Sequence, residues 1–145
     1  MLKTQSMKKI EHIGIAVKDL AAANATYTAL LKTEPYKNET VESEGVSTSF
    51  FKTGESKIEL LAATNADSPV AKFIEKRGEG IHHIAFAVDD IEAEISRLEE
   101  EGFQLLNKTP KPGADNKLVA FLHPKSAHGV LVELCQEKPH PEGEE

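Results

Sequence analysis

Four side chains that can bind a metal ion recur in pairs along the sequence, His12 with Glu59 and His83 with Glu133. In each pair the histidine comes first, and the glutamate follows at nearly the same separation. Two neutral imidazoles and two carboxylates form a mixed nitrogen and oxygen ligand set that suits divalent Zn, Co, Ni, Mn or Fe. We therefore predict one metal ion bound by all four side chains, with room left for two oxygen atoms of a substrate.

Such a site favours chemistry at a carbon next to a carbonyl group. A metal ion near the carbonyl oxygen stabilises the enolate that forms when a base removes the neighbouring proton. Glu59 and Glu133 are the candidate bases, because burial and nearby charges tune the basicity of a carboxylate. One carboxylate on each side of the carbon could remove a proton from one face and return it to the other, which is the reaction of an epimerase.

A duplicated segment places the two histidines. Residues 12–20 read HIGIAVKDL and residues 83–91 read HIAFAVDDI. In both copies apolar residues alternate with the face that carries the histidine, which is the period of a half-buried strand. His82 is predicted to point away from this face. Because a His and a Glu recur at equivalent places, and buried carboxylates are costly without a partner, we favour a shared site over ordinary packing.

Helices and further strands complete each copy. Asp19 and Asp90 stand where a helix N-cap belongs, and Ser68 followed by Pro69 marks a helix in the connector. Further strands are predicted over residues 46–52, 57–62, 103–106, 118–122 and 130–135. The pattern predicts an α+β fold of paired βαβββ modules that form a curved mixed sheet around a metal cleft. The expected boundaries within one structural domain are a first module at 8–64, a connector helix at 65–79, a second module at 80–136 and a disordered tail at 137–145.

Composition narrows the classes of function. The chain has 145 residues, 39% of them hydrophobic and 28% charged, which is ordinary for one globular domain. A net charge of −7 opposes a general nucleic-acid or anionic-membrane surface. The single cysteine excludes an intrachain disulfide and a thiolate metal cluster, and no stretch is long and apolar enough to span a membrane. These features favour a cytoplasmic protein.

Three longer stretches carry a resemblance to a known family. The runs DSPVAKFI (67–74), GIHHIAFAVDDI (80–91) and FLHPKSAHGVLVEL (121–134) are similar to methylmalonyl-CoA epimerases, a family within the glyoxalase-like vicinal-oxygen-chelate superfamily. The similarity extends over about residues 8–136. It implies interconversion of (R)- and (S)-methylmalonyl-CoA in propionate metabolism, through an enolate of the thioester, by a metal-dependent homodimeric isomerase.

The same resemblance implies residue roles. His12, His83 and Glu133 match the family's metal ligands, Glu59 falls at the place of the fourth, and Glu133 also matches the base. Some members carry a further acid on the strand that here reads VSTSF (46–50), and this strand has none. The second base is therefore either Glu59 or a water molecule.

Coenzyme A needs an apolar slot for its pantetheine arm and cations for its phosphates. Lys111, Lys117 and Lys125 lie in predicted loops, and we expect them to contact the phosphates. Backbone amides of residues 111–116 are expected to hold the substrate carboxylate.

Three other functions remain compatible with the same scaffold. A glyoxalase I would use the same four ligands on a glutathione hemithioacetal. An extradiol dioxygenase would need only two His and one Glu, which leaves Glu59 without a role. A module that binds a small molecule without metal or catalysis has no need for all four, so their joint presence favours an enzyme.

Overall fold

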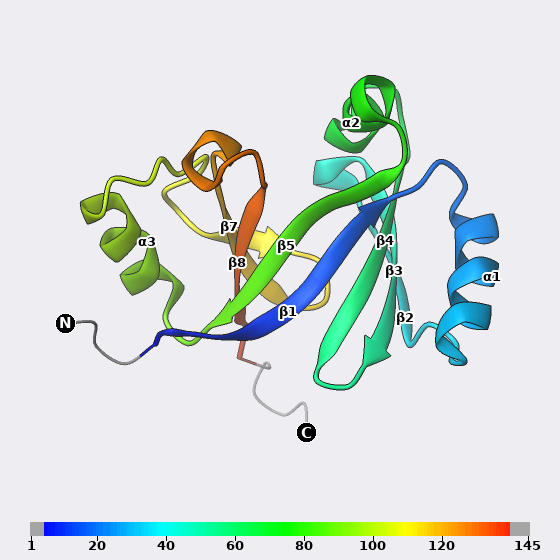
Figure 1. Ribbon diagram of the computed structural model, residues 1–145, viewed down its shortest axis with the longest axis horizontal. Coiled ribbons are helices and arrows are strands. Elements are labelled where there is room, and N and C mark those ends of the chain that lie inside the picture. The colour runs from blue at the N-terminus through cyan, green and yellow to red at the C-terminus, as the bar shows by residue number, and fades with distance from the viewer. Residues whose placement is uncertain (1–4, 140–145) are drawn as a thin grey trace.

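The computed structural model describes residues 5–139 and forms one eight-stranded mixed sheet flanked by helices (Figure 1). The first half contains β1 (Met7–Ala16), α1 (Leu20–Leu31), β2 (Lys37–Val41), the 3-10 helix η1 (Glu42–Glu44), β3 (Val46–Thr53) and β4 (Ser56–Ala63). The connector contains α2 (Pro69–Arg77). The second half contains β5 (Gly80–Val88), α3 (Ile91–Glu100), β6 (Lys111–Gly113), β7 (Lys117–Leu122), the 3-10 helix η2 (Pro124–Ala127) and β8 (Val132–Glu137).

The two halves repeat the same order of one strand, one helix and three strands. The sheet order is β2-β3-β4-β1-β5-β8-β7-β6, so β1 and β5 pair antiparallel at the centre and the halves mirror one another outward. Parallel pairing of β1 with β4 and of β5 with β8 is the same in both halves. The paired βαβββ architecture predicted from the sequence is confirmed.

The predicted helix starts are confirmed by their caps. The Asp19 carboxylate accepts a hydrogen bond from the Ala22 amide, and Asp90 accepts one from Ala93 in the second copy, both at 3.1 Å. These bonds satisfy amides that would otherwise have no partner in the first helical turn. Ser68 caps α2 in the same way. None of the helices in residues 5–139 is long and apolar enough to cross a membrane.

Strand alternation separates a packed face from a cavity face. On β3, Phe51 is fully buried in a cluster with α1, whereas its neighbour Phe50 lines a cavity on the other face. On β8, Leu134 is fully buried in the cluster under α3, whereas Glu133 lines the cavity. Figure 1 shows α1 and α3 at opposite ends of the sheet. Each half therefore has its own apolar core, and the polar side chains share the space between the halves.

The strands at both edges of the sheet were missed or misplaced by the sequence pattern. Edge strand β2 is polar, and β6 covers only three residues of a segment predicted as a loop. The strand predicted at 103–106 is wrong, because only Leu105 forms a single bridge, to Leu122. The side chain of Asn107 accepts the Phe121 amide hydrogen that a continuing ladder would use. In the tail predicted at 137–145, Glu137 is the last residue of β8, and residues 140–145 lie outside the described part of the chain.

Candidate metal centre

The side chains of His12, Glu59, His83 and Glu133 converge between the two halves, and all four residues are at most 6% exposed. The two Nε2 atoms lie 3.1 Å apart. His12 Nε2 is 3.2 Å from Glu59 Oε1 and 3.3 Å from Glu133 Oε1. His83 Nε2 is 3.5 Å and 2.9 Å from the same two atoms. The duplicated segments therefore bring together the four side chains that the sequence singled out.

These distances fit a shared divalent cation. Ligand atoms about 2.1 Å from a metal ion are about 3.0 Å apart at right angles and about 3.4 Å apart at a tetrahedral angle. The separations between the imidazole and carboxylate atoms fall around these values. Among the described residues, no Lys or Arg forms an ion pair with Glu59 or Glu133. Two buried carboxylates without a permanent cation, facing two imidazoles, are a donor set suited to a metal ion.

Without a metal ion the cluster is held by protons on the imidazoles. Burial alone would lower the pKa of His83, but hydrogen bonds with Glu133 and Glu59 outweigh it and raise the pKa to about 9. The pKa of His12 is raised in the same way. Burial would raise the pKa values of Glu59 and Glu133, but the two imidazoles lower both. Metal binding must therefore displace protons from the histidines.

A carboxylate that sequence reasoning did not single out supports His12 from behind. Glu11 is 5% exposed, and its Oε1 accepts a hydrogen bond from His12 Nδ1 at 2.7 Å. Lys57 donates to the other oxygen at 2.7 Å. Burial would raise the pKa of Glu11, but these two bonds lower it to about 2. The ionised carboxylate fixes the proton of His12 on Nδ1 and leaves Nε2 free for a cation.

His82 supports His83 at the equivalent place, which corrects the expectation that it points away. Its Nδ1 lies 2.9 Å from His83 Nδ1. Burial, followed by the charge of His83, lowers the pKa of His82 to about 4, so His82 is neutral and accepts this hydrogen bond. The support is thus a carboxylate in one half and an imidazole in the other.

Two β-bulges explain why neighbouring residues can serve the same site. The pairing of β1 with β5 skips Glu11 on one strand and His82 on the other. An extra residue in a bulge locally breaks the alternation of side chains and redirects them. The simple period of two was therefore wrong at these positions. A polar residue next to each histidine, where alternation predicts an apolar one, was the available signal.

Small residues leave room for the histidines. Gly14 pairs with His83 across the central strands, and a Cβ atom at residue 14 would overlap the His83 ring. The absent side chain at Gly14 on β1 thus leaves the space that the ring of His83 on β5 fills. A larger residue at this position would displace the ring from the cluster.

The two carboxylates have different surroundings. The thiol of Cys135 donates to Glu133 Oε2 at 3.4 Å, and burial followed by the Glu133 charge raises the thiol pKa, so the thiol stays protonated. Thr48, on the strand without an acid, lines the cavity and donates its hydroxyl hydrogen to the Glu39 carbonyl. Thr48 therefore supplies no base.

The three lysines expected to bind coenzyme A lie in different environments. Lys117 is 5% exposed, and its ammonium lies within 4 Å of Glu11, Asp115 and Glu137. It is already neutralised and does not reach a surface phosphate. Lys125 is exposed on η2. Lys111 lines the cavity and pairs with Glu44.

The cavity beside the cluster has a volume of about 100 Å³. Ligand pockets for whole drug-sized molecules are usually about 300–1,000 Å³. The cavity therefore admits only the reacting end of a larger ligand. Its walls include Val46, Leu61 and Phe121, so this end is surrounded mainly by apolar surface.

Comparisons with known proteins agree with the geometry. Residues 11–121 match the glyoxalase/bleomycin resistance protein/dioxygenase superfamily. An ethylmalonyl-CoA/methylmalonyl-CoA epimerase of Cereibacter sphaeroides is 44% identical over 130 residues, which cover 88% of this chain and 97% of that protein.

Solved structures give the same relationship. The crystal structure of methylmalonyl-CoA epimerase from Mycobacterium tuberculosis has a TM-score of 0.90 at 35% identity, over 96% of this chain and 94% of that one. A Streptomyces coelicolor methylmalonyl-CoA epimerase in complex with 2-nitronate-propionyl-CoA has a TM-score of 0.87 at 37% identity, over 94% and 100%. The chain therefore belongs to the methylmalonyl-CoA epimerase family of the glyoxalase/bleomycin resistance protein/dioxygenase superfamily.

Proposed function

We propose that the protein epimerises methylmalonyl-CoA, interconverting the (R) and (S) configurations at the α-carbon. The observation that carries the proposal is the pair of buried carboxylates, Glu59 from the first half and Glu133 from the second, at the end of a small cavity. Relatives that are epimerases of this substrate support the choice over a glyoxalase. The acyl-CoA in the Streptomyces structure supports the substrate class.

The four converging side chains would hold a divalent metal ion, and Co, Zn, Ni and Mn all suit them. When bound, the cation supplies electrostatic stabilisation of the charge that develops on the thioester oxygen as the α-proton leaves. Glu11 keeps His12 in the tautomer that binding requires, and His82 does the same for His83.

Proton transfer falls to the two carboxylates. In one direction the Glu133 carboxylate would take the α-proton after releasing its place as a ligand. Glu59, after release and uptake of a proton from water, would return that proton to the opposite face of the planar carbon. The two groups regain their starting states by exchange with water. Because the strand that contains Thr48 lacks the acid that some family members carry there, Glu59 is our choice for the second base, and a water molecule is the alternative.

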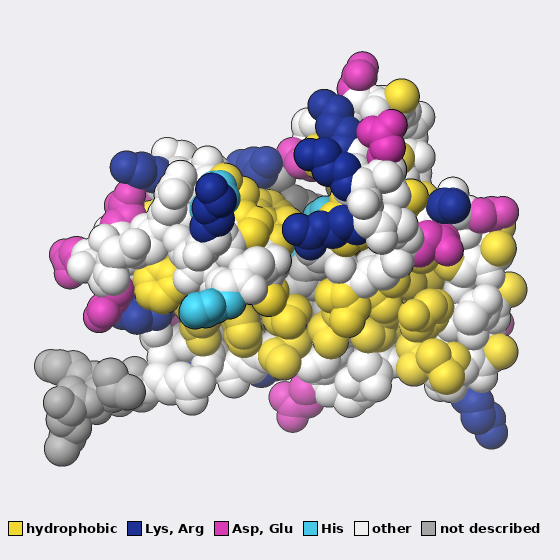
Figure 2. Space-filling view, turned by 45° about the horizontal axis from the view of Figure 1, so that its top comes forward, with side chains coloured by type: hydrophobic (Ala, Val, Ile, Leu, Met, Phe, Trp, Pro, Cys, Tyr) yellow, Lys and Arg dark blue, Asp and Glu magenta, His cyan; other side chains and the backbone are white. Residues whose placement is uncertain are grey.

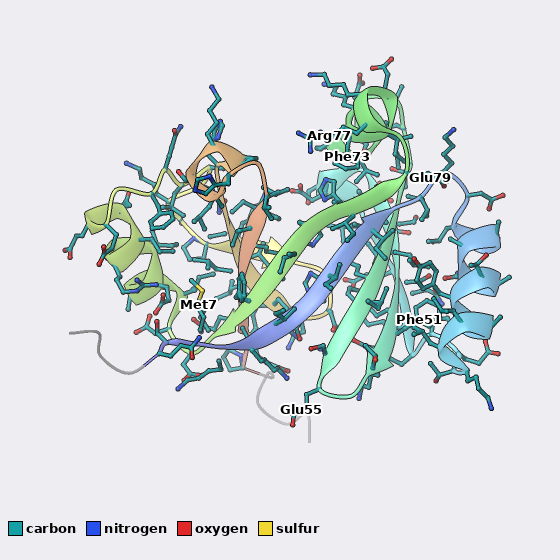
Figure 3. The ribbon with its side chains drawn as sticks, in the orientation of Figure 1. Met7, Phe51, Glu55, Phe73, Arg77 and Glu79 are labelled. Atoms are coloured by element: carbon teal, nitrogen blue, oxygen red, sulfur yellow. The ribbon has the colours of Figure 1, made fainter. Side chains whose placement is uncertain are left out.

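The rest of coenzyme A must lie outside the cavity. A groove of about 680 Å³ borders it and shares the rings of His82 and His83 as walls. Phe73 and Val130 give this groove apolar surface, and its cations are Lys72, Lys76 and Arg77. Figure 2 shows Lys and Arg side chains around the hollow between the halves, and Figure 3 shows Phe73 and Arg77 side by side on α2. We place the pantetheine arm and the phosphates in this groove.

We also propose a homodimer. Ile10 and Ile81, on the central strands β1 and β5, are 41% and 63% exposed. Figure 2 shows a band of hydrophobic side chains across the face turned toward the viewer. An exposed apolar band of this kind is typical of an interface. Light scattering after gel filtration should give twice the mass of one chain, and a monomer at micromolar concentration would contradict this.

The decisive experiment is hydrogen exchange at the α-carbon. Protein loaded with cobalt or zinc is incubated with methylmalonyl-CoA in deuterated water, and the α-proton is followed by NMR. Loss of the α-proton signal is expected, whereas no exchange with fully loaded protein would refute the function. With the fold intact, Glu133→Gln should abolish epimerisation, and it should abolish exchange of the epimer whose α-proton Glu133 removes. Glu137→Gln, an exposed change on the same strand, should do neither.

The deuterium content of the product formed early in the reaction distinguishes Glu59 from water as the second base. In a two-base reaction a single epimer yields deuterated product while the remaining substrate keeps its hydrogen. Glu59→Gln should then abolish epimerisation but allow exchange without inversion. Epimerisation that survives in this variant would assign the second proton transfer to water.

A further inference from the structure

Lys111 occupies the mouth of the cavity. Among the described residues that line the cavity it is the only Lys or Arg. It belongs to β6 of the second half, and its ammonium lies 3.0 Å from the carboxylate of Glu44, in η1 of the first half. The two side chains are 42% and 37% exposed. The pair therefore bridges the two halves where a ligand enters.

An aromatic wall connects Lys111 with the metal centre. The ammonium is 5.9 Å from the centre of the Phe121 ring, which attracts a cation through its face. The same ring lies 6.2 Å from the ring of His83, edge to face. Lys111, Phe121 and His83 therefore line the same cavity, and the Phe121 ring lies near both the ammonium and a proposed metal ligand.

A negatively charged substrate group in the cavity needs a cation such as the Lys111 ammonium nearby. Methylmalonyl-CoA differs from an ordinary acyl-CoA by an ionised carboxylate on the α-carbon. A divalent ion would balance the charges of Glu59 and Glu133, so the substrate carboxylate adds one further negative charge, and burying a charge without a partner is costly. A lysine on the wall of the cavity can supply this partner.

We propose that Lys111 binds the free carboxylate of the acyl group and so selects acyl-CoAs that carry one. Glu44 holds the ammonium in place before substrate arrives and releases it to the incoming carboxylate. Partly exposed ion pairs are weak, so the exchange is easy. The proposal rests on the proposed function for its substrate class, and it gives Lys111 a role at the reacting end in place of the phosphates.

The test compares the affinities of two thioesters by isothermal titration of the metal-loaded protein. Propionyl-CoA has the same coenzyme and lacks only the carboxylate. Binding of methylmalonyl-CoA can be measured at equilibrium, because turnover merely mixes its two epimers. Lys111→Met should weaken methylmalonyl-CoA about 10- to 100-fold, the effect of losing a hydrogen bond to a charged group, and leave propionyl-CoA unchanged.

Three further variants complete the test. Lys111→Arg should restore most of the preference, and Glu44→Gln should strengthen methylmalonyl-CoA binding because the competing carboxylate is gone. Lys108→Met removes an exposed lysine that pairs with Glu99 away from the cavity, and it should change neither affinity. Thermal unfolding of each variant confirms that it is folded.

Other outcomes overturn the assignment. An equal loss for both thioesters in Lys111→Met would place the ammonium on the coenzyme, and no loss for either would remove it from the substrate. A wild-type protein that prefers methylmalonyl-CoA in a Lys111-dependent way but exchanges no α-proton would keep this assignment and refute the epimerase. Absence of binding for both thioesters would refute the two together.

Discussion

Glu11→Gln tests whether the carboxylate behind His12 tunes the metal centre. The substitution keeps the shape of the side chain and removes its charge. Glu11 now accepts 2.7 Å hydrogen bonds from His12 and from Lys57, both to an ionised oxygen. Hydrogen bonds to charged groups are worth about 1.5–3 kcal/mol, which corresponds to about 10- to 100-fold in affinity. Loss of partners behind metal-binding histidines has effects of the same size.

Zinc affinity is the direct measurement, by competition with a chromophoric chelator at pH 7. Glu11→Gln should bind zinc about 10- to 100-fold more weakly and remain folded, since Lys57 keeps Asp115 as a partner at 3.3 Å. Glu94→Gln is the matched control, because Glu94 is also a buried carboxylate, but it bonds Arg97 on α3. Unchanged zinc affinity in folded Glu11→Gln, or an equal loss in the control, would refute the reasoning.

Three more predictions follow from other features. Gly14→Ala should weaken zinc binding by crowding His83, and zinc titration against wild type would show no difference if the ring can move aside. Zinc binding at pH 7 should release about two protons, because the pKa values of His12 and His83 are raised in the metal-free protein. Zinc affinity should therefore fall as the pH falls. Released protons are taken up by the buffer, so titration heats that are the same in buffers of different ionisation enthalpy would contradict this. Leu98, on the buried face of α3, is only 4% exposed, so Leu98→Ala should lower the free energy of unfolding by about 2–5 kcal/mol in urea. A loss below this range would mean that the core closes around the gap.

The four-residue cluster could be predicted from the sequence because the duplicated segments can be compared with each other. A histidine and a glutamate at equivalent places in both copies indicated a shared site, and alternation in each strand indicated the shared face. The sequence placed Gly14 on the face of His12, but it could not show that the space above Gly14 is filled by the His83 ring from the neighbouring strand.

Glu11 and His82, which support the two histidines, could not be predicted from the sequence in the same way. Alternation assumes an unbroken ladder, and the bulges at Glu11 and His82 break it where the site is built. Lys117 looked like a loop lysine, but the fold brings three carboxylates from β1, β8 and the preceding turn around it. Edge strand β2 was missed because its exposed residues are polar and carry little periodic signal. Each failure reflects tertiary pairing that local sequence does not encode.

The unequal surroundings of Glu59 and Glu133 have a consequence for the kinetics of the proposed reaction. The two epimers of the substrate are nearly equal in free energy, because their other stereocentres lie far away in the coenzyme. Thermodynamics then requires nearly equal kcat/KM in both directions, however different the two carboxylates are. The difference made by the Cys135 thiol must appear instead in how the deprotonated intermediate partitions between return and inversion. Tritium placed on the α-carbon of each epimer should therefore wash out at different rates while the net conversions match.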